Sequence, residues 1–295
     1  MANITANGIQ IEYDTFGEKT SPPLLLVMGL GAQMILWDEG FCEQLADKGL
    51  YVIRFDNRDI GLSTKFEDAG VPNMMEMMTD RAEGKEVTAP YSAEDMADDA
   101  VGLLDALGIE KAHICGASMG GMIIQTIGYR HPSKVLSLVS IMSTTGDPSL
   151  PQSTPEAMTA LTTPAPSERD AYLDHSVKTQ KVIGSPGFPF DEEEQRQKAA
   201  RSFDRSFYPQ GMARQMAAIM VQGNRRPELA AITAPTLVIH GADDPLVPVE
   251  GGKDTADAIP GAELLIIEGM GHSMPEGAWP QIVGAISEHT RKVSG

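Results

Sequence analysis

The chain has 295 residues, with 41 acidic against 23 basic side chains and a formal net charge of -18. A surface this acidic repels phosphate backbones and anionic membranes, so neither nucleic acid nor a membrane is an expected partner. Hydrophobic residues make up 42% and charged residues 22%, a composition typical of a folded domain that needs no metal or disulfide to support its core.

The two cysteines are expected to be core residues. Cys42 falls in a predicted helix and Cys115 at the end of a predicted buried strand, which does not suggest a disulfide framework or a metal site. The N-terminal residues have no basic segment followed by an apolar one, and no apolar run is long enough to span a membrane. We therefore expect a cytoplasmic protein.

Strands and helices alternate in the first half of the chain. Two β-prone runs on either side of Asn7-Gly8 predict an antiparallel hairpin at 2–6 and 9–15. An uninterrupted apolar run predicts a strand buried on both faces, as in a parallel sheet, at 23–28, and further strands are expected at 50–55, 111–115 and 135–142. Helices are expected between them, the second with Ser92 as its N-cap, at 37–48, 91–107 and 119–129.

The pattern changes after residue 143, where strand signals vanish and three helical patterns appear near 167–180, 191–203 and 210–222. Strand patterns resume at 235–240 and 263–267, with helices at 249–258 and 277–292. We predict an α/β fold with a mostly parallel eight-stranded sheet and helices on both faces. The core would comprise 1–144 and 225–295, with a helical cap at 145–224.

The pentapeptide Gly116-Ala117-Ser118-Met119-Gly120 follows a predicted strand and opens a predicted helix. A serine at such a sharp strand-to-helix turn is exposed above the sheet, and small neighbours relieve the crowding of the backbone. The helix N-terminus also favours developing negative charge. Ser118 is therefore the predicted nucleophile, whereas the alternative is a glycine-rich packing turn.

A serine hydroxyl needs a base, and six histidines are available. His272 lies in a glycine-rich loop after the final predicted strand, where loops border the ligand crevice of an open α/β sheet. We predict that it is the general base. The preceding strand is followed by Asp243-Asp244-Pro245, and Asp244 is the predicted acid of the triad, with Asp243 as a turn or cap residue.

An oxyanion hole needs two backbone N–H groups. One is expected from Met119, after the nucleophile, and the other from Leu30 in the Gly29-Leu30-Gly31 turn after the first parallel strand.

These motifs together resemble the α/β-hydrolase superfamily, over about 1–144 and 225–295. Asp56-x-Arg58-x-x-Gly61-x-Ser63 resembles a loop of that family, although Asp59 stands where a glycine is usual. Met28-Gly29 replaces the commoner His-Gly, which removes a side-chain hydrogen bond that often braces the oxyanion loop. The whole pattern is similar to the serine esterase branch that includes aclacinomycin methylesterase.

The resemblance implies a carboxylic ester hydrolase that acts on a small to medium apolar molecule through an acyl-enzyme intermediate, without cofactor or metal. Alternatives with the same triad are a C–C bond hydrolase, a cofactor-free perhydrolase or a lactonase, and a non-enzymatic binding protein is disfavoured. The expected partner is a small-molecule ester, and a homodimer is considered as the assembly.

Apolar residues outside the triad could contact the substrate. The Met-rich stretch at 74–78 fits either a core-packing helix or an adaptable apolar surface of the acyl pocket. Aromatic residues of the predicted cap present the same two alternatives. Our candidate substrate-binding residues are Gly29, Met75, Met78 and Phe207.

Overall fold

The computed structural model describes residues 1–294, which form one eight-stranded sheet of order β1-β2-β4-β3-β5-β6-β7-β8. Strand β2 is antiparallel to both of its neighbours, whereas the pairs from β4 through β8 are all parallel. The predicted fold class is therefore confirmed. The strands are β1 (Ala2–Ala6), β2 (Ile9–Phe16), β3 (Pro23–Val27), β4 (Tyr51–Phe55), β5 (Ala112–Ala117), β6 (Val135–Ile141), β7 (Thr236–Gly241) and β8 (Glu263–Ile267).

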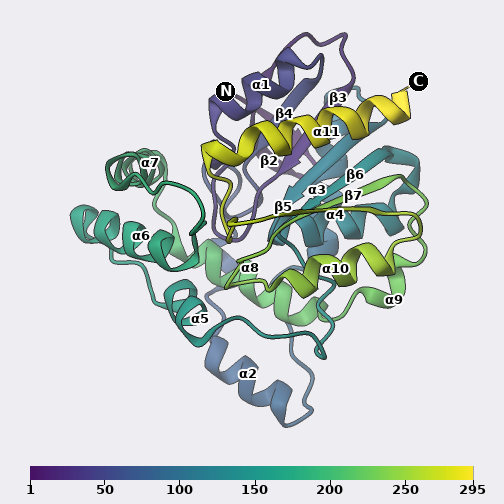
Figure 1. Ribbon diagram of the computed structural model, residues 1–295. Coiled ribbons are helices and arrows are strands. Elements are labelled where there is room, and N and C mark those ends of the chain that lie inside the picture. The colour runs from purple at the N-terminus through teal and green to yellow at the C-terminus, as the bar shows by residue number, and fades with distance from the viewer. Residues whose placement is uncertain (295) are drawn as a thin grey trace.

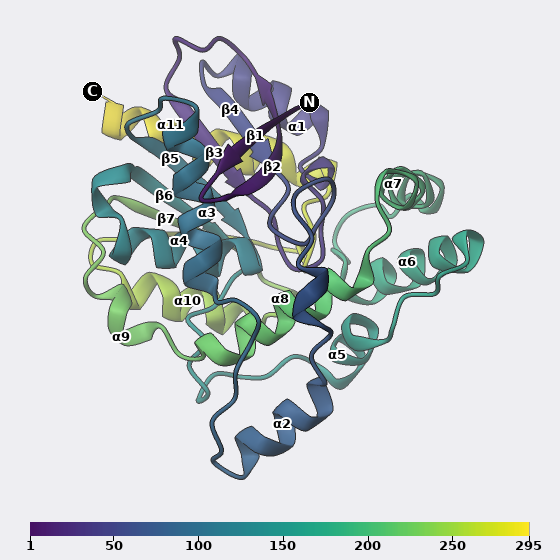
Figure 2. The same ribbon diagram turned by 180° about the vertical axis from the view of Figure 1, so that it is seen from behind.

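Helices cover both faces of the sheet (Figures 1 and 2). On one face lie α1 (Glu39–Asp47) and α11 (Trp279–Ser294). The other face is covered by α3 (Ala93–Ala106), α4 (Met119–Arg130) and α10 (Val249–Ala258). Further short helices are α9 (Arg226–Leu229), η1 (Met34–Leu36), η2 (Glu67–Ala69), η3 (Pro132–Lys134) and η4 (Glu276–Ala278).

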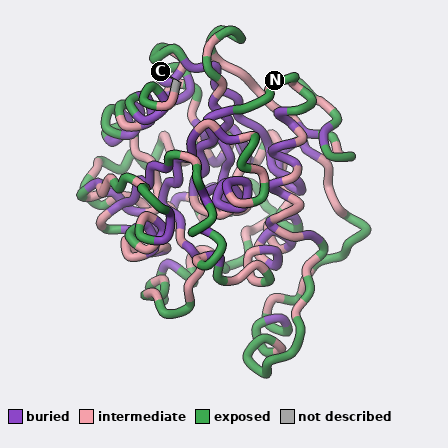
Figure 3. Tube along the Cα trace, turned by 90° about the vertical axis from the view of Figure 1, so that its right-hand side faces the viewer, coloured by how far each residue is buried: buried purple, intermediate pink, exposed green. Residues whose placement is uncertain are grey.

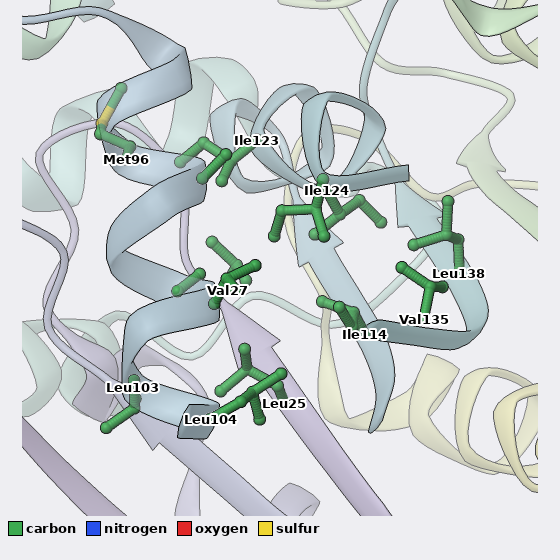
Figure 4. Close-up of a cluster of buried hydrophobic side chains, with 14 of the residues drawn as sticks. Leu25, Val27, Met96, Leu103, Leu104, Ile114, Ile123, Ile124, Val135 and Leu138 are labelled. Carbon is green, nitrogen blue, oxygen red and sulfur yellow. The ribbon is translucent and has the colours of Figure 1, made fainter. Parts of the chain in front are cut away.

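The burial of β3 on both faces of the sheet explains why its sequence is apolar without interruption. Leu24 and Leu26 pack into the cluster on the α1 and α11 face, while Leu25 and Val27 point the opposite way. On that opposite face, Leu25 and Val27 pack in a second hydrophobic cluster with side chains of α3, α4, β5 and β6 (Figure 4). Because successive residues of a strand face opposite sides, a strand covered on both sides has no position that favours a polar residue.

Local capping sets several helix ends. Ser92 and Asp95 form a reciprocal capping box at the start of α3, so the predicted N-cap is confirmed. Helix α1 begins at Glu39 rather than at Trp37, because the Asp38 side chain accepts from the Gly40 amide and caps the helix there.

The region from 145 to 224 contains four helices, which are α5 (Pro155–Thr162), α6 (Arg169–Ile183), α7 (Glu192–Arg205) and α8 (Pro209–Gln222). The sequence pattern predicted three of them. Helix α5 was not predicted, although Thr154 caps it and Pro155 occupies its first turn, which is a known start signal. Helices α5, α6 and α7 extend from one side of the sheet, and α8 lies closer to it (Figure 1). The assignment of 145–224 as a separate cap domain stays a prediction.

The Met-rich stretch forms α2 (Met74–Ala82), which extends away from the sheet (Figures 1 and 2). The chain is buried at the centre of the molecule and mostly exposed or half-buried at its periphery (Figure 3). Only Met77 of α2 is buried. No described helix has the length and apolar character that crossing a bilayer would need.

Candidate active site

Ser118 lies at the turn between β5 and α4. Its φ of 55° falls in the left-handed region, which is uncommon for a residue with a side chain and is typical of a strained functional turn. The Ser118 amide donates to the Ile141 carbonyl at 2.9 Å, so β6 supports the turn. A Cβ at Gly116 would lie 2.2 Å from the Gly120 carbonyl oxygen, and one at Gly120 only 2.1 Å from the Val27 oxygen. Both glycines of the pentapeptide are therefore required by backbone contacts.

Three predicted side chains form one chain of hydrogen bonds. His272 Nε2 lies 2.9 Å from Ser118 Oγ, and His272 Nδ1 lies 2.7 Å from Asp244 Oδ2. The Asp244 side chain is fully buried, and its other oxygen accepts from the amides of Leu246 at 2.9 Å and Val247 at 2.8 Å. These bonds fix the carboxylate and favour the imidazole tautomer that carries its proton on Nδ1, leaving Nε2 free to accept from the serine.

The neighbouring carboxylate has a different position. Asp243 Oδ2 accepts from the Gly269 amide at 2.9 Å, and the Asp243 amide donates to the Met270 carbonyl at 3.0 Å. Asp243 thus connects the loop after β7 to the loop after β8. It makes turn contacts of the kind predicted for it, and it is Asp244 that reaches His272.

His240 contributes to the site although the sequence did not single it out. Its Nε2 lies 2.8 Å from the Val247 carbonyl oxygen and 3.7 Å from Asp244 Oδ2. Burial lowers the pKa of His240, which favours a neutral ring that donates from Nε2. The ring supports the loop that carries Asp244. No sequence signal distinguished it from an ordinary residue at a strand end.

The predicted oxyanion loop, residues 29–31, lies directly against the nucleophile turn. A Cβ at Gly29 would be 3.1 Å from both the Ala117 oxygen and Ser118 Cβ, so this close approach needs glycine. Within residues 1–294, neither the Leu30 amide nor the Met119 amide donates to a protein acceptor. Both N–H groups are therefore available to a ligand, as an oxyanion hole requires.

The loop from Asp56 to Ser63 joins the oxyanion loop to α7. Asp56 Oδ1 accepts from the Met34 amide at 2.8 Å, and Oδ2 lies 2.7 Å from Nη1 of Arg205 on α7. Asn57 Nδ2 donates to the Met28 carbonyl at 2.9 Å. The sequence identified this loop as a motif but did not predict that Asn57 would support Met28.

Asp59 has a φ of 70°, a conformation that aspartate tolerates better than most residues. Its carboxylate receives two hydrogen bonds from Arg214 on α8, at 2.8 and 2.9 Å. Burial alone would raise the pKa of Asp59, but hydrogen bonds from Arg214 and from the Phe66 amide hold that pKa below its ordinary value. Asp59 thus forms a buried ion pair with α8.

The loop that carries His272 is held from the other side by the end of α6. The His272 amide donates to the Ile183 carbonyl at 2.7 Å, and the Gly271 amide donates to Ser185 Oγ at 3.0 Å. A Cβ at Gly271 would lie 2.0 Å from the Gly184 oxygen, so the two backbones are in direct contact.

The candidate substrate-binding residues are not brought together. Gly29 lies beside Ser118, whereas Met75 and Met78 on α2 are 75% and 58% exposed. Phe207 is half-buried, with its ring centroid 4.8 Å from that of Phe203 and 5.6 Å from that of Tyr172. Phe207 therefore belongs to an aromatic cluster between α6 and the end of α7, and the two methionines extend into solvent.

Cys42 and Cys115 are free and buried, in the positions predicted for them. Burial raises the pKa of the Cys42 thiol to about 12, so it is not a reactive thiolate at neutral pH. Among the described residues, no group of three or more His, Cys, Asp or Glu side chains could hold a metal ion.

A profile of the alpha/beta hydrolase fold family matches residues 22–277, and the chain belongs to this family. It is 29% identical to the rhodomycin D methylesterase DauP of Streptomyces sp. (strain C5), covering 98% of this chain and 97% of that protein. A second rhodomycin D methylesterase, DnrP of Streptomyces peucetius, is 27% identical with the same coverage. The predicted resemblance to the superfamily and its esterase branch is thus confirmed.

Among solved structures, the enol-lactonase of Burkholderia xenovorans LB400 is similar, with a TM-score of 0.74 and 23% identity over 98% of this chain and all of that one. This likeness concerns the fold.

Proposed function

We propose that the protein is a carboxylic ester hydrolase that cleaves an ester of a small to medium apolar molecule through an acyl-enzyme on Ser118. The observation that carries this proposal is the continuous hydrogen-bond chain from Ser118 Oγ through His272 to the buried carboxylate of Asp244. The similarity to two methylesterases over nearly the full length of the chain supports the same reaction class.

In the first half-reaction, His272 Nε2 takes the proton of Ser118 as Oγ attacks the ester carbonyl carbon. The negative charge that develops on the carbonyl oxygen is stabilised by the amides of Leu30 and Met119, aided by the N-terminus of α4. Asp244 stabilises the imidazolium. His272 then gives its proton to the leaving alcohol oxygen, the ester C–O bond breaks, and the acyl group remains on Ser118.

In the second half-reaction, His272 takes a proton from a water molecule that attacks the acyl carbon. The second tetrahedral intermediate collapses, the bond to Ser118 Oγ breaks, and His272 returns the proton to the serine. The carboxylic acid leaves and the enzyme is restored. No oxidant, reductant or cofactor enters this balance.

We further propose that Gly29 and Phe207 contact the substrate, Gly29 because it lies beside Ser118 and Phe207 as part of the aromatic cluster. Contact by Met75 and Met78 requires a bulky substrate or a movement of α2, given their exposure. Substituting both with serine tests this role, because pocket residues would change KM for a long acyl ester and leave a short one unaffected.

The proposal includes a cytoplasmic location, with which two free, buried cysteines are compatible. A homodimer is proposed as the assembly, since the exposed methionines of α2 give an apolar surface for pairing. Light scattering coupled to size-exclusion chromatography measures the assembly directly.

The main test is labelling with a fluorophosphonate probe, which reacts with an activated serine. The wild type is expected to be labelled and Ser118→Ala to be inert, and an unlabelled wild type contradicts the proposal. A panel of p-nitrophenyl esters, methyl esters and lactones then defines the acyl group. Activity confined to a vinylogous diketone would favour C–C bond hydrolysis, and peroxide-dependent halogenation would favour a perhydrolase.

A further inference from the structure

The oxyanion loop is held by a side chain from α8. Gly31, with a φ of 67°, donates its amide hydrogen to Gln215 Oε1 at 2.9 Å. On its other side, Gln215 Nε2 donates to the Arg58 carbonyl at 3.0 Å. The two backbone partners fix which end of the side-chain amide faces which group, since only oxygen can accept from the Gly31 N–H. Gln215 therefore connects the oxyanion loop to the loop from Asp56 to Ser63.

Gln215 is itself rigidly supported. Its side chain is fully buried, and the preceding residue, Arg214, forms the buried ion pair with Asp59. One turn earlier, a Cβ at Gly211 would lie 2.2 Å from the Asp59 carbonyl oxygen, so the helix backbone touches the loop. Met212 covers the position that a Gly31 side chain would occupy. Helix α8 thus cannot shift without disturbing the oxyanion loop.

The amide that Gln215 holds belongs to the peptide group between Leu30 and Gly31. Fixing this peptide limits ψ of Leu30, and Leu30 supplies the N–H proposed to bind the oxyanion. The Met28 side chain offers the loop no strong hydrogen bond, because a thioether has no donor and is at most a weak acceptor. The Met28 carbonyl is instead held by Asn57, at 2.9 Å.

We propose that Gln215 is a positioning residue for the oxyanion hole, which holds the oxyanion loop from α8 through the Gly31 amide. The inference rests on the proposed ester hydrolysis, since it assigns how the Leu30 amide is aimed. Gln215 acts through the loop and does not touch the substrate. Its loss leaves the Gly31 amide without its acceptor and frees the loop to rotate away from the transition-state oxygen.

The test compares Gln215→Met with Gln222→Met, two changes of glutamine to methionine on the same helix. Gln222 also uses both ends of its amide, bonding Thr126 Oγ1 at 2.8 Å and Arg225 Nη1 at 3.0 Å, but it does not touch the oxyanion loop. We expect Gln215→Met to lower kcat by about tenfold to a hundredfold, less than the loss of an oxyanion donor itself, with KM nearly unchanged. Gln222→Met is expected to keep the wild-type kcat.

A trifluoromethyl ketone inhibitor separates positioning from general damage, because its adduct places an oxyanion in the hole. Its inhibition constant is expected to rise in Gln215→Met in proportion to the loss of kcat/KM. A wild-type kcat in Gln215→Met, or a lost kcat with an unchanged inhibition constant, overturns the inference. If the methionine variant does not fold, Gln215→Asn keeps a side-chain amide but shortens it by one methylene, which withdraws the acceptor from the Gly31 amide, and a wild-type kcat in this variant also overturns the inference. Failure of the wild type to hydrolyse esters would instead contradict the proposed function.

Discussion

The backbone amide of His272 donates to the Ile183 carbonyl at 2.7 Å, so the last residue of α6 fixes the loop that presents the imidazole to Ser118. Helix α8 supports the oxyanion loop in a similar way through Gln215. Both contacts come from the region between 145 and 224. The helices of this region therefore support the geometry of the site as well as extending beside it, and changes at their contact points should affect the reaction.

The first prediction concerns Gly271, whose substitution by alanine would place a Cβ 2.0 Å from the Gly184 carbonyl oxygen. The Cβ is attached directly to the backbone of residue 271, and the atom it would meet is a backbone oxygen, so no side-chain rotation can relieve the contact. The loop that carries His272 must therefore move. A displacement of about 1 Å in a catalytic group can cost roughly a hundredfold in rate, and we expect a fall in kcat of this order. Steady-state kinetics with a p-nitrophenyl ester measures it.

Gly284→Ala is the matched control, because Gly284 lies in α11 with open space around it. Alanine is favoured over glycine in a helix by up to about 1 kcal/mol, so its melting temperature should stay equal or rise while kcat is unchanged. Equal kcat in Gly271→Ala and wild type would refute the importance of this contact.

The second prediction separates the two adjacent carboxylates. Asp244→Asn removes the acceptor that orients His272 and favours the wrong tautomer, so kcat should fall by about ten-thousandfold. Asp243→Asn keeps an oxygen that can accept from the Gly269 amide, and its loss of kcat should stay below about tenfold. A larger defect in the Asp243 variant than in the Asp244 variant would exchange their assigned roles.

The third prediction concerns the ion pair of Asp59 and Arg214, both of which are buried. Arg214→Met leaves the Asp59 carboxylate buried without its partner, which should lower the free energy of unfolding by about 3–5 kcal/mol. Urea unfolding at pH 7 measures the change. Adding Asp59→Asn removes the orphaned charge and should recover part of the loss. If Arg214→Met alone is as stable as the wild type, solvent or another group compensates the Asp59 carboxylate, and the prediction is wrong.

The fourth prediction is a pH dependence of stability that arises from His113. Burial, with a smaller effect of His289, lowers the pKa of His113 from 6.5 to about 4, and its Nδ1 lies 2.8 Å from Ser137 Oγ. The unfolded chain therefore binds a proton between pH 6.5 and about 4 that the native protein does not bind. The contribution to stability is present above pH 6.5 and is lost as the pH falls toward 4, by on the order of 3 kcal/mol.

Urea unfolding at pH 7.5 and 5.0 tests this, with His113→Asn as the companion variant. Asparagine is not titratable, so the difference in unfolding free energy between the two pH values should be smaller in the variant than in the wild type. His240 and His289, whose pKa values burial also lowers, should leave a residual dependence of the same sign. An identical difference in both proteins would contradict the assignment to His113.

Much of the fold could be predicted because its signals are local or periodic. The strand at β3 is apolar at every position, and Ser92 caps α3 with the residue types that a capping box needs. Helix α5 was not predicted, since its start lies in a stretch rich in Pro, Thr and Ser that resembles a loop. The Met-rich stretch is compatible with two interpretations, because side-chain type does not show what a helix packs against.

The sequence by itself determined the positions where the site could form. The pentapeptide around Ser118 is specified by backbone crowding, and the loops of Asp244 and His272 follow strands whose carboxyl ends meet at one edge of a parallel sheet. Such features depend on a few neighbouring residues and on the order of strands.

Only the tertiary structure decided how these loops are held. Gly31 and Gln215 are 184 residues apart in the chain, and Asp59 and Arg214 are 155 residues apart. The sequence around each of these residues does not indicate which residue it contacts. Their contacts depend on the position of α8 against the sheet, which is set by packing over the whole molecule. The exposure of Met75 and Met78 was decided in the same way, because a helix with apolar residues can be buried or exposed according to what lies beside it.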